Sequence, residues 1–233
     1  MRQERRYVHG PVPRMTTTLW DYSSANYPGG KQGDADYVGA TPSYVVWNLL
    51  DRYTQPGEAV LDPMCGSGTT LDVAKDLGRV GLGYDLQPQR PDILEADARR
   101  LPLDDGCVDF IFVDPPYSNH IRYSGRPECI GELDARVGGY FEAMDLVFGE
   151  LDRVLRSGRH LAVYVSDSAQ KGREFVPIGI TLFGLLQRRF EAVDHVAVVR
   201  HNKSLKQRQW HIAAQEGNYF LRGFNHLLIF RKG

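Results

Sequence analysis

Residues 59–85 read AVLDPMCGSGTTLDVAKDLGRVGLGYD, and this stretch decides the fold. Its apolar start predicts a short buried strand, and residues 69–77 predict a helix that follows a glycine-rich turn. Gly66 and Gly68 let the backbone approach a ligand closely, while the start of the helix supplies unpaired N–H groups. A second predicted strand ends at Asp85, where an acidic residue can hold ribose hydroxyls. The order of strand, glycine turn, helix and strand predicts an α/β fold with a ligand bound at the turn.

A second motif, Asp114-Pro115-Pro116-Tyr117, follows the apolar strand CVDFIFV at 107–113. An amino group on a nucleobase or amide is a poor nucleophile because its lone pair is delocalised. Asp114 and the Pro115 carbonyl can accept both N–H bonds and favour a tetrahedral, attacking nitrogen. The prolines rigidify the turn, and Tyr117 offers a stacking face for a base, worth about 1–3 kcal/mol. The motif predicts chemistry on a planar amino group, although Pro-rich turns are also common in loops without a function.

Two further segments flank these motifs. The stretch EADARRLPL at 95–103 places Asp97 and the backbone of Ala98 on a loop suited to reading an adenine ring. A lone acidic loop residue is more often solvated, but two acids in order after one glycine turn favour a ligand role. Upstream, ATPSYVVWNLLDRY predicts a helix with Thr41 as its N-cap and Pro42 at its first position.

The segments LDPMCGSGTT, GYD, EADARRLPL and VDFIFVDPPY together resemble the S-adenosylmethionine-dependent amino-methyltransferases that modify adenine N6 or cytosine N4 in DNA. The resemblance covers roughly residues 41–168 and implies a Rossmann-like class I methyltransferase fold. It implies that the glycine turn cradles the methionine part of S-adenosylmethionine, and that the DPPY carboxylate and tyrosine serve the target base. It assigns Thr41, Asp62, Met64, Gly66, Gly68, Thr69, Asp85, Asp97 and Ala98 to the cofactor, and Asp114, Pro115, Pro116 and Tyr117 to catalysis. Met64 stands where many relatives have Phe, and its thioether can fill the same apolar gap.

The remaining pattern fits one domain with a seven-stranded, mostly parallel sheet. The chain has 233 residues, 42% of them hydrophobic, enough for one sizeable core. Residues 1–40 read as an N-terminal extension. Alternating segments predict a helix at 140–155 that Ser157-Gly158 stops, a strand at 160–165, a helix at 178–189, and strands at 191–199 and 224–230. The last two strands have the pattern of a terminal antiparallel pair.

Two polar segments, 118–139 and 200–222, are candidate substrate-recognition loops. Basic residues interleaved with aromatics suit phosphate contact and base stacking, although a solvated loop anchored by its Trp fits equally well. The candidate substrate-binding residues are Asn119, His120, Arg122, Arg200, Asn202, Lys203 and Trp210.

Composition limits the partners and the cellular compartment that we expect for the protein. With 28 basic and 29 acidic residues, the net charge is −1, so attraction to nucleic acid requires a local patch. No secretory signal or membrane-spanning run is present. Three scattered cysteines lack metal-ligand spacing and argue against a disulfide framework. We expect a cytoplasmic protein without a metal.

The substrate stays open at this stage. Because the motif starts with Asp, adenine N6 is slightly favoured over cytosine N4, in duplex DNA with a flipped base or in single strands. Similar turns occur in enzymes that methylate guanine N2 or adenine N6 in RNA, or a glutamine amide. No dedicated recognition region is visible, so specificity is short or comes from a partner or homodimer. A nonenzymatic or NAD-type dinucleotide-binding module is the alternative of another class, but it predicts a third glycine and leaves DPPY unexplained.

Overall fold

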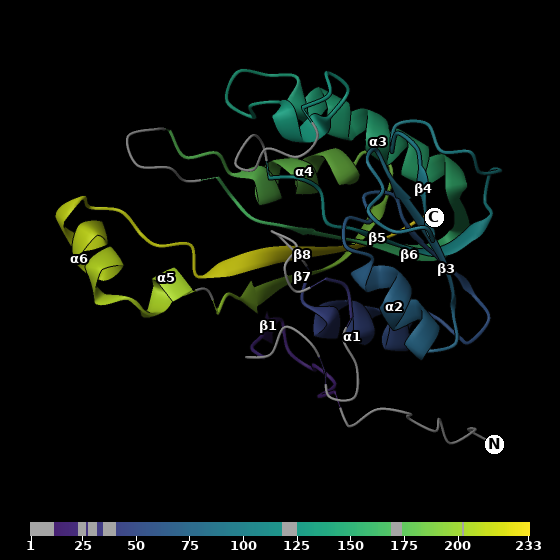
Figure 1. Ribbon diagram of the computed structural model, residues 1–233, viewed down its shortest axis with the longest axis horizontal. Coiled ribbons are helices and arrows are strands. Elements are labelled where there is room, and N and C mark those ends of the chain that lie inside the picture. The colour runs from purple at the N-terminus through teal and green to yellow at the C-terminus, as the bar shows by residue number, and fades with distance from the viewer. Residues whose placement is uncertain are drawn as a thin grey trace.

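The computed structural model describes residues 12–22, 27, 32–34, 41–117, 125–168, 174–201 and 203–233. One eight-stranded sheet runs through them in the order β1-β7-β8-β6-β5-β2-β3-β4, with helices on both faces (Figure 1). The strands are β1 (Leu19–Trp20), β2 (Ala59–Asp62), β3 (Val80–Asp85), β4 (Ile93–Glu95), β5 (Val108–Val113), β6 (Leu155–Val165), β7 (Glu191–Val199) and β8 (Phe224–Arg231). The helices are α1 (Ser43–Tyr53), α2 (Thr69–Asp76), α3 (Tyr140–Val154), α4 (Ile178–Leu186), α5 (Lys203–Lys206) and α6 (Arg208–Glu216), with a 3₁₀ helix η1 (Ile130–Glu132).

The sheet is parallel from β4 through β3, β2 and β5 to β6. Strand β8 runs antiparallel to both of its neighbours, β6 and β7, which confirms the predicted terminal pair and the Rossmann-like class I fold. The two-residue β1 pairs with β7 and adds an eighth strand to the expected seven. β4 has only three residues, too few for a periodic signal in the sequence.

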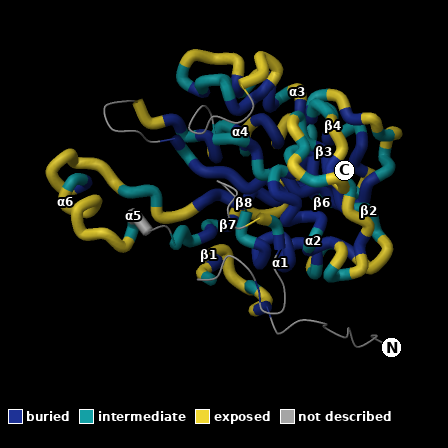
Figure 2. The backbone as a smooth tube through the Cα atoms, viewed as in Figure 1, coloured by how far each residue is buried: buried dark blue, intermediate teal, exposed yellow. Residues whose placement is uncertain are grey.

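Strand β5 carries the centre of the core. All six of its residues are buried, as expected for a strand covered by helices on both faces. Ile111 and Val113 face a cluster that includes α3 and α4, and Phe110 and Phe112 face a second cluster around α1. Figure 2 shows this buried interior as a continuous dark layer. The DPPY turn therefore directly follows a strand that is buried along its whole length.

Two predicted boundaries were wrong. Helix α3 ends at Val154 and β6 begins at once at Leu155, so Ser157-Gly158 lie inside a strand rather than in a turn. Gly158 accommodates this with a φ of +77° and donates its N–H to the carbonyl of Lys232 at 2.8 Å. Main-chain pairing therefore outweighs the local turn signal. Helix α4 ends at Leu186, three residues before the predicted end.

The N-terminal extension and the segment between β7 and β8 differ in their packing. Of the N-terminal extension, Val12, Trp20 and Tyr27 are buried in the cluster around α1. Residues 200–223, which we name the arm, link β7 to β8 and project from the body (Figure 1). The segment predicted as a recognition loop thus contains two short helices, α5 and α6. The arm leaves from the edge of the sheet at which the parallel strands end.

Candidate active site

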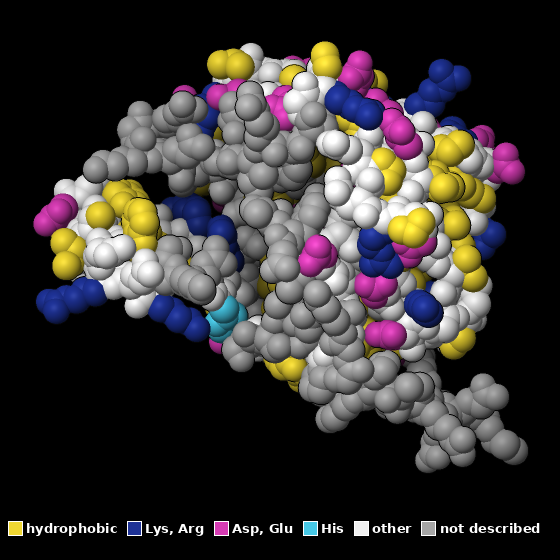
Figure 3. Space-filling view, viewed as in Figure 1, with side chains coloured by type: hydrophobic (Ala, Val, Ile, Leu, Met, Phe, Trp, Pro, Cys, Tyr) yellow, Lys and Arg dark blue, Asp and Glu magenta, His cyan; other side chains and the backbone are white. Residues whose placement is uncertain are grey.

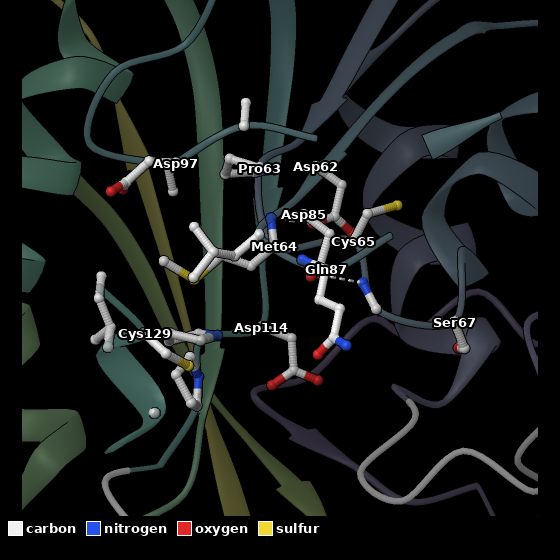
Figure 4. A pocket seen from close by; sticks show the side chains of 18 of the residues that line it. Asp62, Pro63, Met64, Cys65, Ser67, Asp85, Gln87, Asp97, Asp114 and Cys129 are labelled. Atoms are coloured by element: carbon white, nitrogen blue, oxygen red, sulfur yellow. Dashed lines mark hydrogen bonds between the residues drawn. The ribbon is translucent and has the colours of Figure 1, made fainter. Parts of the chain in front are cut away.

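A pocket opens at the carboxyl ends of β2, β3 and β5, where parallel sheets of this kind hold ligands. The lining brings together segments from the glycine turn, the ends of β3 and β4, the DPPY turn and the region of η1 (Figure 4). Of the residues that the sequence assigned to cofactor and catalysis, only Gly68 is not in the lining. The others there are Thr41, Asp62, Met64, Gly66, Thr69, Asp85, Asp97, Ala98, Asp114, Pro115, Pro116 and Tyr117.

Gly68 shapes the turn from behind. Its φ of +81° lies in the left-handed region, and a Cβ placed there would lie 2.4 Å from Nη1 of Arg90. The Arg90 guanidinium donates to the carbonyl of Ser67 at 3.2 Å and forms two 2.9 Å bonds with the carboxylate of Asp72. Glycine at 68 is therefore needed both for the backbone conformation and for this close approach.

Asp62 holds the glycine turn onto α2. Its Oδ1 accepts the N–H of Met64 at 3.1 Å and its Oδ2 accepts the hydroxyl of Thr70 at 2.5 Å. Burial raises the pKa of Asp62 to about 7, although both hydrogen bonds act in the opposite direction. The carboxylate therefore organises the backbone of the turn, and it lies close enough to Asp85 to feel its charge.

The next two carboxylates lie along the pocket floor. Asp85 accepts the N–H of Gly66 and the N–H of Gln87, each at 2.9 Å, so it joins the glycine turn to the end of β3. Asp97 pairs with Arg99, with 2.6 Å between Oδ2 and Nη2. Burial acts to raise the pKa of Asp97, but the hydrogen bonds from Arg99 hold it below its ordinary value. Asp97 is therefore an ionised acceptor at neutral pH.

Asp114 lies half-buried at the opposite side of the pocket. Thr41 donates its hydroxyl to Oδ2, and Tyr117 donates its hydroxyl to Oδ1 at 2.8 Å. Desolvation raises the pKa of Asp114 to about 7 despite these two bonds. The predicted capping role of Thr41 was wrong: α1 begins at Ser43 with Pro42 as its N-cap and no side-chain cap bond. Thr41 instead links the start of α1 to the DPPY carboxylate.

The DPPY turn itself is held in place from α3. The hydroxyl of Tyr140, the first residue of that helix, donates to the carbonyl of Pro116 at 2.7 Å. Within the described residues, no hydrogen bond reaches the carbonyl of Pro115, so it is available to a ligand. The arrangement presents one protonatable carboxylate and one free carbonyl to the same pocket as the glycine turn. Such a pair can accept both N–H bonds of an amino group.

Two predicted recognition residues have described side chains, Arg200 and Trp210, and neither lines the pocket. Arg200 donates to the hydroxyl of Ser166 at 3.1 Å, and Trp210, on α6, is 44% exposed and bonds Gln207 at 2.9 Å. Lys203 begins α5, and its side chain is not described. Asn119, His120, Arg122 and Asn202 lie outside the described residues.

Sequence reasoning missed one wall of the pocket. The stretch from Glu128 to Gly131, which includes η1, lines it beside the DPPY turn, and Gln87 and Gln89 complete the rim after β3. These residues carry no motif, and only their position inside the predicted recognition loop or after a strand end hinted at a role.

Known proteins can now be compared with this geometry. Residues 2–96 match the family model for N6 and N4 methyltransferases that is described as DNA methylase. This part of the chain is similar to the DNA methylases. The matched residues include the glycine turn and Asp85 and end before the DPPY motif. The family match therefore supports the cofactor side of the pocket, and the DPPY motif is separate support for the side that would hold the target base.

Two curated methyltransferases are similar to parts of the chain. The Type II methyltransferase M1.MboII of Moraxella bovis is 28% identical over 92 residues, which cover 38% of this chain and 35% of that protein. The Type II methyltransferase M.MthZI of Methanothermobacter thermautotrophicus is 37% identical over 57 residues, which cover 24% of this chain and 16% of that protein. The matched parts thus span about a third and a sixth of these relatives.

Among solved structures, the chain resembles the 1,6-didemethyltoxoflavin-N1-methyltransferase of Burkholderia thailandensis. The TM-score is 0.52 at 16% identity, over 82% of this chain and 76% of that one. This likeness shows the class I methyltransferase fold alone. Within the described residues, no group of three or more His, Cys, Asp or Glu side chains is placed to hold a metal ion. No described helix combines the length and apolarity needed to cross a bilayer.

Proposed function

We propose that this protein transfers a methyl group from S-adenosylmethionine to the exocyclic amine of a DNA base, with adenine N6 slightly favoured over cytosine N4. One observation carries the proposal: Asp114, a half-buried carboxylate with a raised pKa, shares a pocket with a glycine turn and two acidic strand ends. The similarity to the DNA methylases supports DNA as the substrate.

The donor set of the pocket fits S-adenosylmethionine. The turn at Gly66 would take the methionine part, Asp85 would hold ribose hydroxyls, and Asp97 with the backbone of Ala98 would read the adenine ring. Asp85 keeps lone pairs for this purpose, because the hydrogen bonds from Gly66 and Gln87 use one site on each carboxylate oxygen. When bound, the cofactor supplies a methyl group on a sulfonium, which leaves as a neutral thioether.

The acceptor side would work through Asp114 and Pro115. Two acceptors on the N–H groups draw the nitrogen lone pair out of conjugation with the ring. The target nitrogen forms the new bond to the methyl carbon and then loses one proton, which Asp114 can take because its pKa is raised to about 7. Tyr117 would stack on a base that has left the duplex. To do so it must release the hydroxyl bond that it donates to Asp114 at 2.8 Å.

The arm is proposed to contact the phosphates beside the target base. Five of its residues, Arg200, Lys203, Lys206, Arg208 and Arg222, are basic and one, Glu216, is acidic, in a chain whose net charge is −1. Within the described residues, none of the arm's arginines forms an ion pair. Most described arginines of the body do, Arg99 with Asp97 and Arg153 with Glu150 among them. Unpaired cations on an exposed element suit a polyanion. Asn119, His120 and Arg122, which follow the DPPY motif in the chain and lie outside the described residues, are proposed to contact the base.

A methyl-transfer assay tests the proposal directly. Tritiated S-adenosylmethionine is offered with unmethylated genomic DNA and, separately, with total RNA, and the products are digested and identified by nucleoside mass spectrometry. We expect label in DNA as N6-methyladenine. Label as N4-methylcytosine would correct the base, and label in RNA alone would correct the nucleic acid. No label in either would overturn the proposal.

A further inference from the structure

The arm carries a large apolar side chain that is almost fully exposed to solvent. Phe220 is 85% exposed, more than any other described aromatic residue. It lies after α6, in the limb that returns from the tip of the arm to β8. Exposure of a whole Phe side chain forgoes roughly 1.5–3 kcal/mol of burial. Trp210, Ile212 and Tyr219 of the arm are also exposed, so Phe220 does not stand alone, and several exposed apolar side chains on one element indicate a partner surface.

The backbone around Phe220 is fixed rather than loose. Tyr219 donates its N–H to the carbonyl of Ala214 at 3.0 Å, which ties the limb to α6. On the other side, Nη2 of Arg222 donates to the carbonyl of Phe220 itself at 2.9 Å. The guanidinium of Arg222 also lies over the ring of Phe175, 5.2 Å from its centroid. Phe220 is therefore held in place by its neighbours while its ring projects.

The surroundings of Phe220 carry the opposite charge to DNA. Arm residues sum to a net charge of +4, because five Arg or Lys stand against one Glu. Figure 3 shows a hollow between the arm and the body, with Lys and Arg side chains at its inner end and apolar side chains on the arm beside it. A basic groove with an apolar projection is the pattern of proteins that push a side chain between base steps.

Phe220 lies on the arm, which leaves from the same edge of the sheet as the target site. Three residues separate it from Phe224 at the start of β8, a span of at most about 14 Å. Strand β8 lies two strand spacings from β5, about 10 Å, with β6 between them. Since β5 delivers Asp114 at the same edge of the sheet, a duplex on the arm can present one base to the pocket and the adjacent step to Phe220.

We propose that Phe220 is a wedge that enters the base stack of duplex DNA and fills the space left by the target base. The inference rests on the proposed function, and it names the residue that holds the duplex open. Extrusion of a base costs a few kcal/mol in unstacking, and stacking on an aromatic ring returns about 1–3 kcal/mol. The wedge therefore matters only where the target base starts inside a duplex.

The test compares Phe220→Ala and Phe220→Trp with the unaltered protein. Each is assayed for methyl transfer to unmethylated genomic DNA, native or heat-denatured and quickly cooled. We expect Phe220→Ala to lower kcat/KM on native DNA by about tenfold or more, and on denatured DNA by less than about threefold. Phe220→Trp should retain most activity on native DNA, because the indole stacks as well. The matched control is Leu146→Ala, at an apolar residue of α3 that is 62% exposed, and both substrates should be unaffected.

The results separate the two proposals. An equal loss on native and denatured DNA, or no loss on either, overturns the wedge while leaving methyl transfer intact. If the unaltered protein transfers no methyl group to either form of DNA, the proposed function itself fails. Circular dichroism of Phe220→Ala checks that a native-selective loss is not caused by unfolding, which would affect both substrates alike.

Discussion

The pocket and the arm treat charge in opposite ways. In the pocket, hydroxyls, backbone N–H groups or arginines bond Asp62, Asp85, Asp97 and Asp114. In the arm, Arg200 and Arg222 bond only a hydroxyl and a carbonyl within the described residues. The pocket is thus organised before any ligand arrives, whereas the arm's charges are left for a partner. The contrast predicts that pocket variants change chemistry and arm variants change binding.

Asp114→Ala should have the largest effect. Without the carboxylate, nothing pairs with the amino hydrogens or takes the proton, so kcat should fall by about a thousandfold or more. Cofactor affinity should stay within about tenfold, or roughly 1.4 kcal/mol. Methyl transfer and isothermal titration with S-adenosylmethionine measure the two effects. A large loss of cofactor binding instead would mean that Asp114 belongs to the cofactor half of the pocket.

Variants of Tyr117 separate the role of its ring from the role of its hydroxyl. Tyr117→Ala removes the stacking face and should lower kcat/KM on DNA by about tenfold to a hundredfold. Tyr117→Phe keeps the ring and removes only the hydroxyl that bonds Asp114 at 2.8 Å, so its kcat/KM should stay within about threefold. Equal losses in the two variants would show that the hydroxyl, rather than the ring, is what the reaction needs.

Charge reversal in the arm should affect binding alone. With Lys203, Lys206 and Arg208 all changed to Glu, DNA should bind about tenfold more weakly, and its affinity should depend less steeply on salt. The control reverses Arg52, Lys75 and Arg188, which are exposed cations of the body. Fluorescence anisotropy with a labelled duplex between 50 and 200 mM salt, roughly the range over which phosphate contacts are lost, compares the two variants. Identical affinities and salt slopes would remove the arm from the DNA interface.

Sequence order predicted the pocket better than the arm. Asp62, Asp85 and Asp114 each end or follow a parallel strand, so the fold brings their carboxylates to one edge without further information. The contact between Thr41 and Asp114 joins residues 73 positions apart, and no local pattern shows it. Strand β1 is likewise formed only because β7 offers an open edge.

The arm was predicted as a loop because its polar composition hides the helices. Only Ala214 of α6 is buried, so the helix lacks the apolar stripe from which a packed helix is predicted in a sequence. The prediction at Ser157-Gly158 was wrong for the converse reason. A strong turn signal lies within β6, at the irregular register between the pairs Val108–Leu155 and Phe110–His160. Local sequence patterns predict an element correctly where the burial of its residues and their order in the chain agree. They give a wrong prediction where pairing within the sheet determines the conformation.

The smallest expected effect concerns stability and the raised pKa of Asp114. Its pKa is about 7 in the folded protein against an ordinary 3.8. Between these values the folded state holds a proton that the unfolded state has lost, so the free energy of unfolding should fall as pH rises through this window. Asp114→Asn cannot ionise and should lose this slope, while Asp62, whose pKa is raised in the same direction, contributes equally to both proteins. Urea unfolding measures the free energy of unfolding of both proteins at pH 5 and at pH 8. Relative to the unaltered protein, Asp114→Asn should be about 1–2 kcal/mol more stable at pH 8 than it is at pH 5. Parallel curves would mean that Asp114 ionises without penalty, and the pocket would then be as solvated as the arm.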